Sequence, residues 1–324
     1  MPPALKACLA AVALCGVVAT PAIAERLLVS NEKDNTITVL DGDSLKIVRT
    51  VPVGARPRAI ILSHDGKRLF ICASDSDAVD ELDLATMTVT RSLDGGADPE
   101  NFDLARDGRT LFVANENDAM VSFLDVASGK VTKQVPVGVE PEGMAVSPDG
   151  RTLVATSETT GMAHFIDTAS GEVLANVLVD SRPRRATWTP DGKFVWVSAE
   201  VGGTVSVIDA ATHTIVRRIA FAISGVTKEH IQPVSMAITA DGETAFVALG
   251  PANHVAVVDA RTGEVGKYLL VGQRVWNLAF SGDGKRLYAT NGISNDLSVI
   301  DVATRKVVKS VPVGGLPWGV VVAP

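Results

Sequence analysis

The sequence predicts an all-β fold, a seven-bladed β-propeller with four-stranded blades, and three observations lead to this prediction. An Asp-Gly pair recurs about every 42 residues, with one longer interval. Each repeat holds four short runs rich in Val, Ile, Thr and aromatic residues, bounded by Gly, Pro, Asn and Asp. Seven repeats can be counted, and the last run can complete the first repeat. The Asp residues of the recurring pairs are Asp65, Asp107, Asp149, Asp191, Asp241 and Asp283.

Within each repeat, the Asp-Gly pair marks a tight hairpin turn between the first and the second strand. Residues 141–147 illustrate the first strand, which we expect to be innermost in its blade, and residues 110–115 illustrate the second. The fourth strand ends in Val-Gly or a variant of it, as at 135–138. The third strand ends in a recurring Asp, found at Asp41, Asp83, Asp125, Asp167, Asp209, Asp259 and Asp301.

The positions of the strands predict how the ring closes. The second strand is expected at 27–31, 69–73, 111–115, 153–157, 195–199, 245–249 and 287–291. The first strand is expected to begin near residues 57, 99, 141, 183, 233, 274 and 317. The series therefore starts on a second strand and ends on a first strand. We expect the last strand to complete the first blade, which leaves no exposed sheet edge.

The N-terminal 24 residues resemble a secretory signal peptide. Lys6 precedes an apolar run over 7–19, which is too short to span a membrane, and the small residues Ala22 and Ala24 precede the expected cleavage site. Residues 1–24 are therefore interpreted as a signal for export through the inner membrane to the periplasm. Residues 25–324 are interpreted as a single propeller, with no membrane span after removal of the signal.

Cysteine usage agrees with this division. Cys8 and Cys15 lie in the signal, and Cys15 follows Leu14, whereas a lipoprotein signal favours a small residue before its Cys. A lipoprotein anchor is therefore the less favoured alternative. Cys72 lies in an apolar strand, where we expect a buried, unreactive thiol.

Composition and charge restrict the class of partner. The chain has 46% hydrophobic and 21% charged residues, enough apolar surface for a large core, and a net charge of −7. Because binding to a phosphate backbone requires a basic surface, we expect no nucleic-acid partner.

Successive antiparallel strands alternate direction, so the loops after second and fourth strands share one face of the propeller. These loops vary in chemistry, whereas the turns on the other face are uniform, so we place the site on the variable face. The inner ring, one position per blade near the start of the first strand, comprises Arg58, Glu100, Glu142, Arg184, Val234, Trp276 and Trp318. The outer ring, following the second strand, comprises Glu32, Asp75, Glu116, Glu158, Glu200, Gly250 and Gly292.

These rings predict a polarised channel mouth. Arg56, Arg182, Asp98, Glu140, Gln232 and Gln273 are expected to extend it. The mouth could hold a planar anionic ligand, paired by Arg and stacked by Trp, or a hard cation among the carboxylates. An equally weighted alternative is that Arg and Glu pair with each other and fill the rim. The candidate ligand-binding residues are Arg58, Glu100, Glu142, Arg184, Trp276, Trp318, Glu116, Glu158 and Glu200.

Catalysis has little support in the sequence. We find no Gly-x-Ser-x-Gly nucleophile motif, EF-hand loop, zinc spacing or P-loop, and no catalytic residue is assigned. Glu100 and Glu142 could in principle act as an acid–base pair. His164 is predicted to be a hydrogen-bonded core residue, and the extra residues 222–232 to be a surface insertion, with a flap over the binding face as the alternative.

The repeats resemble the YVTN β-propeller repeat along the whole of 25–324. The stretches that carry this resemblance are 27–31 (LLVSN), 111–115 (LFVAN), 287–291 (LYATN), 205–209 (VSVID) and 147–150 (SPDG). A narrower resemblance, to the PQQ-dependent catabolism-associated β-propeller proteins, is carried by 30–36 (SNEKDNT), 139–149 (VEPEGMAVSPD), 248–253 (ALGPAN) and 271–276 (VGQRVW).

The narrower resemblance implies a periplasmic protein of bacteria that oxidise alcohols with quinoprotein dehydrogenases, encoded near transport genes. We therefore expect a non-enzymatic binding or accessory protein whose partner is a periplasmic quinoprotein dehydrogenase or a transport component. No cofactor is assigned, and PQQ, Ca²⁺ and a lanthanide ion are the candidate ligands. A lactonase-like propeller hydrolase and a pure protein-interaction scaffold are the alternatives.

Overall fold

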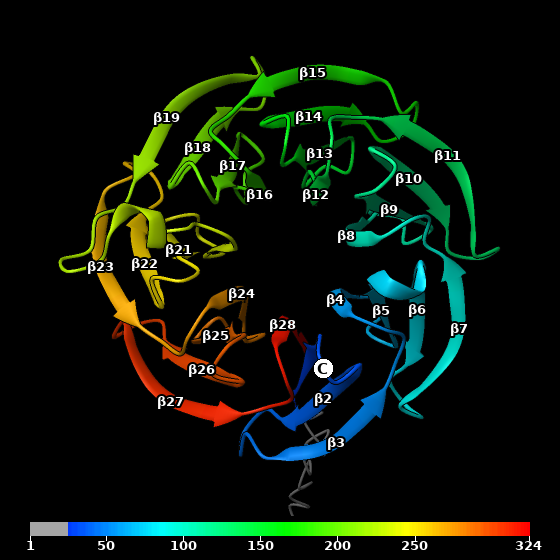
Figure 1. Cartoon of the computed structure of the whole chain (residues 1–324), viewed down its shortest axis with the longest axis horizontal. Helices are drawn as coiled ribbons and strands as arrows, with labels where there is room; N and C mark the ends of the chain where they lie inside the picture. Colours follow the sequence, from blue (N-terminus) through cyan, green and yellow to red (C-terminus); the bar gives the residue numbers. More distant parts are fainter. Residues whose placement is uncertain (1–24) are drawn as a thin grey trace, which may run out of the picture.

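The computed structural model describes residues 25–324, which form seven four-stranded antiparallel sheets arranged as a ring around a central channel (Figure 1). From the innermost strand outward, blade 1 is β28 (Pro317–Ala323), β1 (Arg26–Asn31), β2 (Thr36–Asp41) and β3 (Ile47–Pro52). Blade 2 is β4 (Pro57–Leu62), β5 (Arg68–Ala73), β6 (Ala78–Asp83) and β7 (Thr88–Asp94). Blade 3 is β8 (Pro99–Leu104), β9 (Thr110–Asn115), β10 (Met120–Asp125) and β11 (Lys130–Pro136).

The remaining blades repeat this order. Blade 4 is β12 (Pro141–Val146), β13 (Thr152–Ser157), β14 (Met162–Asp167) and β15 (Val173–Leu178). Blade 5 is β16 (Pro183–Trp188), β17 (Phe194–Ala199), β18 (Thr204–Asp209) and β19 (Thr214–Ala220). Blade 6 is β20 (Met236–Ile238), β21 (Thr244–Ala248), β22 (His254–Asp259) and β23 (Val265–Leu270). Blade 7 is β24 (Val275–Phe280), β25 (Arg286–Asn291), β26 (Asp296–Asp301) and β27 (Lys306–Pro312).

The recurring Asp residues build the turns on one face. In blade 2, the Asp65 carboxylate accepts hydrogen bonds from the Ser63 hydroxyl and the Lys67 N–H, while Gly66 adopts a φ of 67°. Only a residue without a Cβ adopts such a φ at little cost. At the end of β6, Asp83 accepts from the backbone N–H and the hydroxyl of Thr86. The Asp-Gly and terminal Asp signals of the sequence therefore act locally, through side-chain to backbone hydrogen bonds.

Burial explains the near-continuous apolar runs. The second and third strands of a blade are buried on both sides, because neighbouring blades stack face to face, as when Leu28 and Val39 of blade 1 pack with Leu69 and Leu82 of blade 2. The outermost strands alternate exposed and half-buried residues, as in β7. The core is thus a set of layers between blades rather than one central cluster.

The ring closes as expected, since β28 pairs antiparallel with β1 and Val321 lies opposite Leu28. One strand differs from prediction: the innermost strand of blade 6 begins at Met236 rather than near residue 233. Pro233 has no N–H to donate, and the ladder before Met236 is irregular, with Val234 N–H donating to the Ala248 carbonyl at 2.9 Å.

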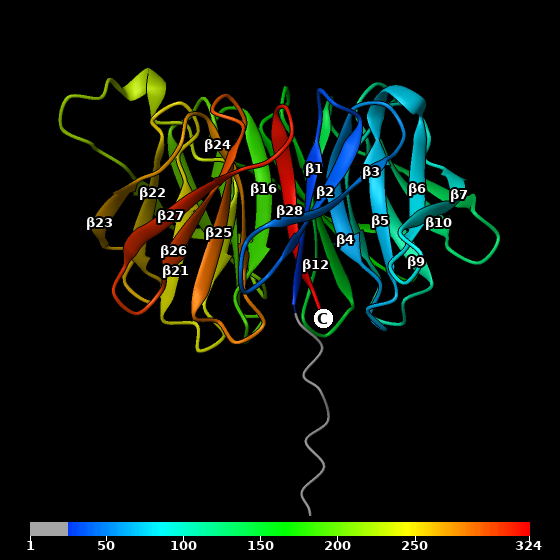
Figure 2. The ribbon, with the colours of Figure 1, turned by 90° about the horizontal axis from the view of Figure 1, so that it is seen from below.

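The insertion 222–232 contains the 3-10 turn η2 (Lys228–His230) and rises above the variable face (Figure 2). In Figure 1 it lies over the outer part of blades 5 and 6 rather than over the channel. It is anchored at both ends, because the Ala222 N–H donates to the Tyr268 hydroxyl at 2.9 Å and Ile231 packs in a cluster with Trp196. A second 3-10 turn, η1 (Ser74–Ser76), lies on the same face after β5.

Among residues 25–324, no helix is long and apolar enough to cross a membrane. The predicted signal peptide, residues 1–24, lies outside the described residues.

Candidate functional site

The inner-ring side chains converge at one end of the channel. Six of the seven are held at the start of an innermost strand, and Val234 precedes β20, so the strand direction brings them to the same mouth. Arg58, Glu100, Glu142 and Arg184 are buried there with Trp318, while Trp276 is half-buried. Ion pairs between neighbours form two clusters of charge, one centred on Arg184 and one centred on Glu100.

The first cluster is centred on Arg184, whose Nη2 lies 2.7 Å from Glu142 and whose Nη1 donates to Glu158. Its Nε lies 3.7 Å from Glu200. Arg182 reaches the same two outer-ring carboxylates from the solvent side, with its Nε 2.7 Å from Glu158. The surrounding carboxylates raise the pKa of Arg184 against the opposing effect of burial, so this guanidinium is permanently charged.

The second cluster is centred on Glu100, which is fully buried and contacts Arg58 Nη1. Arg56 Nη2 lies 3.3 Å from the same carboxylate, and Arg56 Nε lies 3.2 Å from Glu32. The guanidinium of Arg58 also lies 5.3 Å from the centre of the Trp318 ring, a cation–π distance.

Arg274 is a side chain of the mouth that is not among the residues expected there from the sequence. Arg274 lies 2.8 Å from Glu200, donates to Gln232 at 3.1 Å, and stacks at 4.3 Å over Trp276. The mouth residues expected from the sequence include its neighbour Gln273 instead. The correct signal was the spacing: Arg274 precedes its inner-ring residue by two, as Arg56 and Arg182 do, and all three adopt a positive φ between 53° and 60°.

Glu116 differs from the other outer-ring carboxylates of blades 1–5. Within the described residues it has no arginine or lysine within ion-pair distance, and its oxygen lies with those of Asp98 and Glu100 inside a 4.8 Å group. Burial and the nearby Glu142 raise the pKa of Glu116. This side chain is therefore the site's best candidate for holding a proton or accepting a bond from a ligand.

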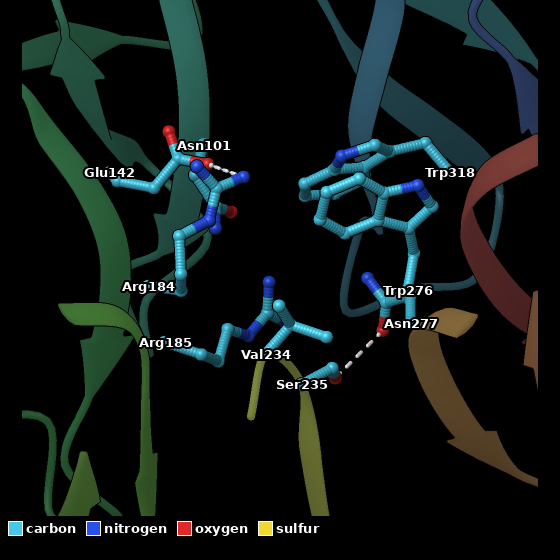
Figure 3. A pocket seen from close by; sticks show the side chains of 9 residues that line it. All are labelled: Asn101, Glu142, Arg184, Arg185, Val234, Ser235, Trp276, Asn277 and Trp318. Atoms are coloured by element: carbon cyan, nitrogen blue, oxygen red, sulfur yellow. Dashed lines mark hydrogen bonds and ion pairs between the residues drawn. The ribbon is translucent and has the colours of Figure 1, made fainter. Parts of the chain in front are cut away.

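The space left at the mouth is small. A cavity of about 20 Å³ lies between Glu142 and Arg184 on one side and Trp276 and Trp318 on the other (Figure 3). Such a volume admits a water molecule. Most of the Arg and Glu side chains at the mouth therefore pair with each other and fill the rim, which is the alternative given above. Ligand binding by these residues stays a prediction.

Two further predictions concern single buried residues. His164 is a hydrogen-bonded core residue, as predicted: its Nδ1 lies 2.6 Å from the Asn176 oxygen, and its Nε2 lies within 3.1 Å of both the Ser157 hydroxyl and the Gly138 N–H. Cys72 is fully buried, and burial raises the pKa of its thiol well above the ordinary value.

Comparison with known proteins gives a family match. The model of the choice-of-anchor I domain family matches residues 117–292, and no curated protein matches the chain.

Solved structures show the same fold. The hydrazine synthase of Kuenenia stuttgartiensis is 24% identical, with a TM-score of 0.78 over 86% of this chain and 92% of that one. A candidate 6-phosphogluconolactonase of Bacteroides fragilis is 19% identical, with a TM-score of 0.78 over 94% and 99%. The dihydro-heme d1 dehydrogenase NirN in complex with DHE is 19% identical, with a TM-score of 0.68 over 91% and 74%. At these identities the likeness concerns the fold alone.

Proposed function

This chain belongs to the choice-of-anchor I domain family, and from its site we propose that it is a non-enzymatic binding protein of the periplasm that serves PQQ-dependent alcohol oxidation. Its partner would be a quinoprotein dehydrogenase or a transport component, bound at the mouth. The PQQ association comes from the sequence resemblance, and export comes from the signal at residues 1–24.

The observation that carries the binding role is the uneven distribution of charge around the mouth. The outer ring is acidic in blades 1–5, and Gly250 and Gly292 replace the acids in blades 6 and 7. The turns on the opposite face, by contrast, are nearly uniform. Ring closure alone does not require this difference, and buried ion pairs are weak contributors to stability. Recognition of a partner explains the concentration of charge better.

The proposed ligands differ in how well the residues fit them. A Ca²⁺ or lanthanide ion takes about six to eight oxygen ligands. Asp98, Glu100 and Glu116 would supply three carboxylates, but Arg56 and Arg58 already neutralise the first two, so the fit is poor. PQQ is a planar tricarboxylate too large for a 20 Å³ cavity. We therefore place it, or a partner protein, over the mouth rather than inside it.

The test is calorimetric titration of residues 25–324 with PQQ, with Ca²⁺, and with a purified PQQ-dependent alcohol dehydrogenase. We expect one of these to bind, and Arg182→Ala to weaken binding at least about tenfold because this half-exposed arginine lies at the rim. Arg49→Ala, on an exposed outer strand, is the matched control. Binding that is equal in both variants, or absent for every probe, would overturn the proposal.

A lactonase-like hydrolase is the second candidate, favoured by Glu116. A carboxylate with a raised pKa beside Glu142 has the character of a general acid or base. Turnover of a sugar lactone that is lost in Glu116→Gln and kept in Glu172→Gln, an exposed control on the opposite face, would establish this activity. A scaffold that uses only the outer strands would instead bind its partner unchanged in Arg182→Ala.

A further inference from the structure

Below the mouth, the channel has a second layer of side chains. It consists of the residue that follows each inner-ring residue, and its members are Ala59, Asn101, Gly143, Arg185, Ser235, Asn277 and Gly319. Three of them, Asn101, Arg185 and Asn277, line both the small mouth cavity and a channel of about 340 Å³ beneath it. That volume is at the low end of the range of about 300–1,000 Å³ for small-molecule sites.

Arg185 carries a positive charge that no protein group neutralises at close range. Within residues 25–324 its guanidinium makes no hydrogen bond or ion pair; only its backbone N–H has a partner, the Ser198 hydroxyl. Figure 3 shows the guanidinium pointing toward the middle of the pocket. The side chain is half-buried, and its remaining exposed surface faces the channel.

The acids near Arg185 are engaged elsewhere. Asp103 accepts hydrogen bonds from the backbone N–H groups of Leu104 at 2.8 Å and Val146 at 2.7 Å. Glu142 is paired with Arg184 at 2.7 Å. Both carboxylates attract Arg185 electrostatically, but neither lies within 4 Å of it, and burial lowers the pKa of this guanidinium. An arginine remains charged under such conditions, so the channel keeps a net donor character there.

The two asparagines add further donors. The Asn101 oxygen accepts the Phe102 N–H at 2.9 Å, and the Asn277 oxygen accepts the Leu278 N–H at 2.8 Å. The Ser235 hydroxyl also donates to the Asn277 oxygen, at 3.3 Å. With both amide oxygens occupied, the two NH₂ groups have no acceptor among the described residues. Both asparagines line the channel, so these NH₂ groups are open to an acceptor-rich ligand or to water there.

The rest of the channel lining is mixed. Ile61, Phe102, Met144, Leu278 and Val320 contribute hydrocarbon, and Asp103 and Thr187 contribute polar groups. Because two backbone N–H groups occupy the Asp103 carboxylate, a ligand held by the donors can place its hydrocarbon against the apolar part of this wall. Inorganic anions would satisfy only the first of these two surfaces.

We propose that the channel binds a short-chain organic carboxylate, with its carboxylate on the guanidinium of Arg185 and the amides of Asn101 and Asn277, and its hydrocarbon part against the apolar part of the wall. A guanidinium and a carboxylate form two parallel charge-assisted hydrogen bonds, which makes this pairing stronger than a neutral one. The site lies below the mouth and does not depend on the function proposed there.

The test is calorimetric titration of residues 25–324 with acetate, butyrate and hexanoate, with butanol and chloride as controls. We expect one carboxylate to bind per chain, and butyrate or hexanoate to bind more tightly than acetate. Neither butanol nor chloride should bind at the same concentration. Equal binding of chloride and butyrate, or no binding of any carboxylate, would overturn the proposal.

Variants assign the site. Arg185→Gln should weaken carboxylate binding at least about tenfold, Arg185→Lys should give an intermediate affinity, and Arg49→Gln, an exposed arginine on an outer strand, should bind as the wild type does. Unchanged binding in Arg185→Gln contradicts the assignment. If Arg185→Gln does not fold, Asn277→Leu is the second variant, because it removes one donor at similar volume. It should also weaken carboxylate binding, and an unchanged affinity of Asn277→Leu for the carboxylate would contradict the proposal. Arg182→Ala, which tests the mouth, should leave carboxylate binding unchanged, so the two proposals fail separately.

Discussion

Replacing Arg184 with methionine removes the side chain that compensates three buried carboxylates at once. Its Nη2 lies 2.7 Å from Glu142 and its Nη1 donates to Glu158. Its Nε lies 3.7 Å from Glu200, and all three carboxylate side chains are at most 4% exposed. Methionine keeps much of the volume and supplies no charge. The variant therefore isolates the electrostatic role of the guanidinium from its packing.

The size of the effect follows from burial. Removing one partner of a buried ion pair costs about 3–5 kcal/mol, because the other partner is left charged and dry. For a domain of this length, with an unfolding entropy of about 2.1 cal/mol/K per residue, Tm should fall by about 5–8 °C at neutral pH.

The loss of stability in Arg184→Met should also depend on pH. Burial raises the pKa of Glu158 above 4.5, and Arg184 opposes that shift, so its removal raises the pKa further. A carboxylate with a raised pKa in the folded state takes up its proton more readily folded than unfolded. The destabilisation is then full above the folded pKa and is relieved as the pH falls through it toward 4.5. The Tm difference from wild type should be smaller at about pH 5 than at about pH 7.

Thermal unfolding followed by circular dichroism measures both effects. Arg182→Met is the matched control, since Arg182 contacts Glu158 and Glu200 but is 49% exposed. Water screens that pair, so we expect a loss of at most about 1 kcal/mol. Equal losses in the two variants, or a Tm difference that does not change with pH, would refute the assigned role of Arg184.

Three further predictions concern the fold. Deleting residues 317–324 removes β28 and exposes the edge of β1, so the truncated chain should aggregate. Light scattering measures this, and a soluble monomer would contradict the stabilising role of ring closure. Cys72 should react with a thiol reagent only in denaturant, and rapid labelling of the native chain would show that it is not buried. His164→Leu leaves the Gly138 N–H and Asn176 without a partner and should cost about 1–3 kcal/mol. Burial lowers the pKa of His164, so the stability that this residue gives the wild type is lost as the pH falls below 6.5. The difference in unfolding free energy between the wild type and His164→Leu should therefore narrow below that pH. A difference that does not change with pH would contradict a buried neutral imidazole.

The periodic part of the structure could be predicted from the sequence because its causes are local. Asp65 and Asp83 close turns with hydrogen bonds to residues two or three positions away, and the apolar runs alternate with these turns at an interval of about 42 residues that is longer only once. Counting the runs predicts seven blades and closure by residues 317–323, since a ring leaves no unpaired edge. Most of the residues at the mouth follow from the same count, but Arg274 does not.

What the mouth residues do to one another was decided only by the tertiary structure. Arg184 of β16 and Glu142 of β12 belong to neighbouring blades, and only the stacking of blades sets the distance between them. Arg274 pairs with Glu200 of blade 5, across the position of blade 6, and Arg185 is distinguished by the partners that its guanidinium lacks. The sequence pattern shows neither property. The size of the cavity depends likewise on how side chains pack in three dimensions. The repeat period of the sequence determined the propeller and the equivalent positions in each blade. Tertiary packing decided which charges are paired and which face an open channel.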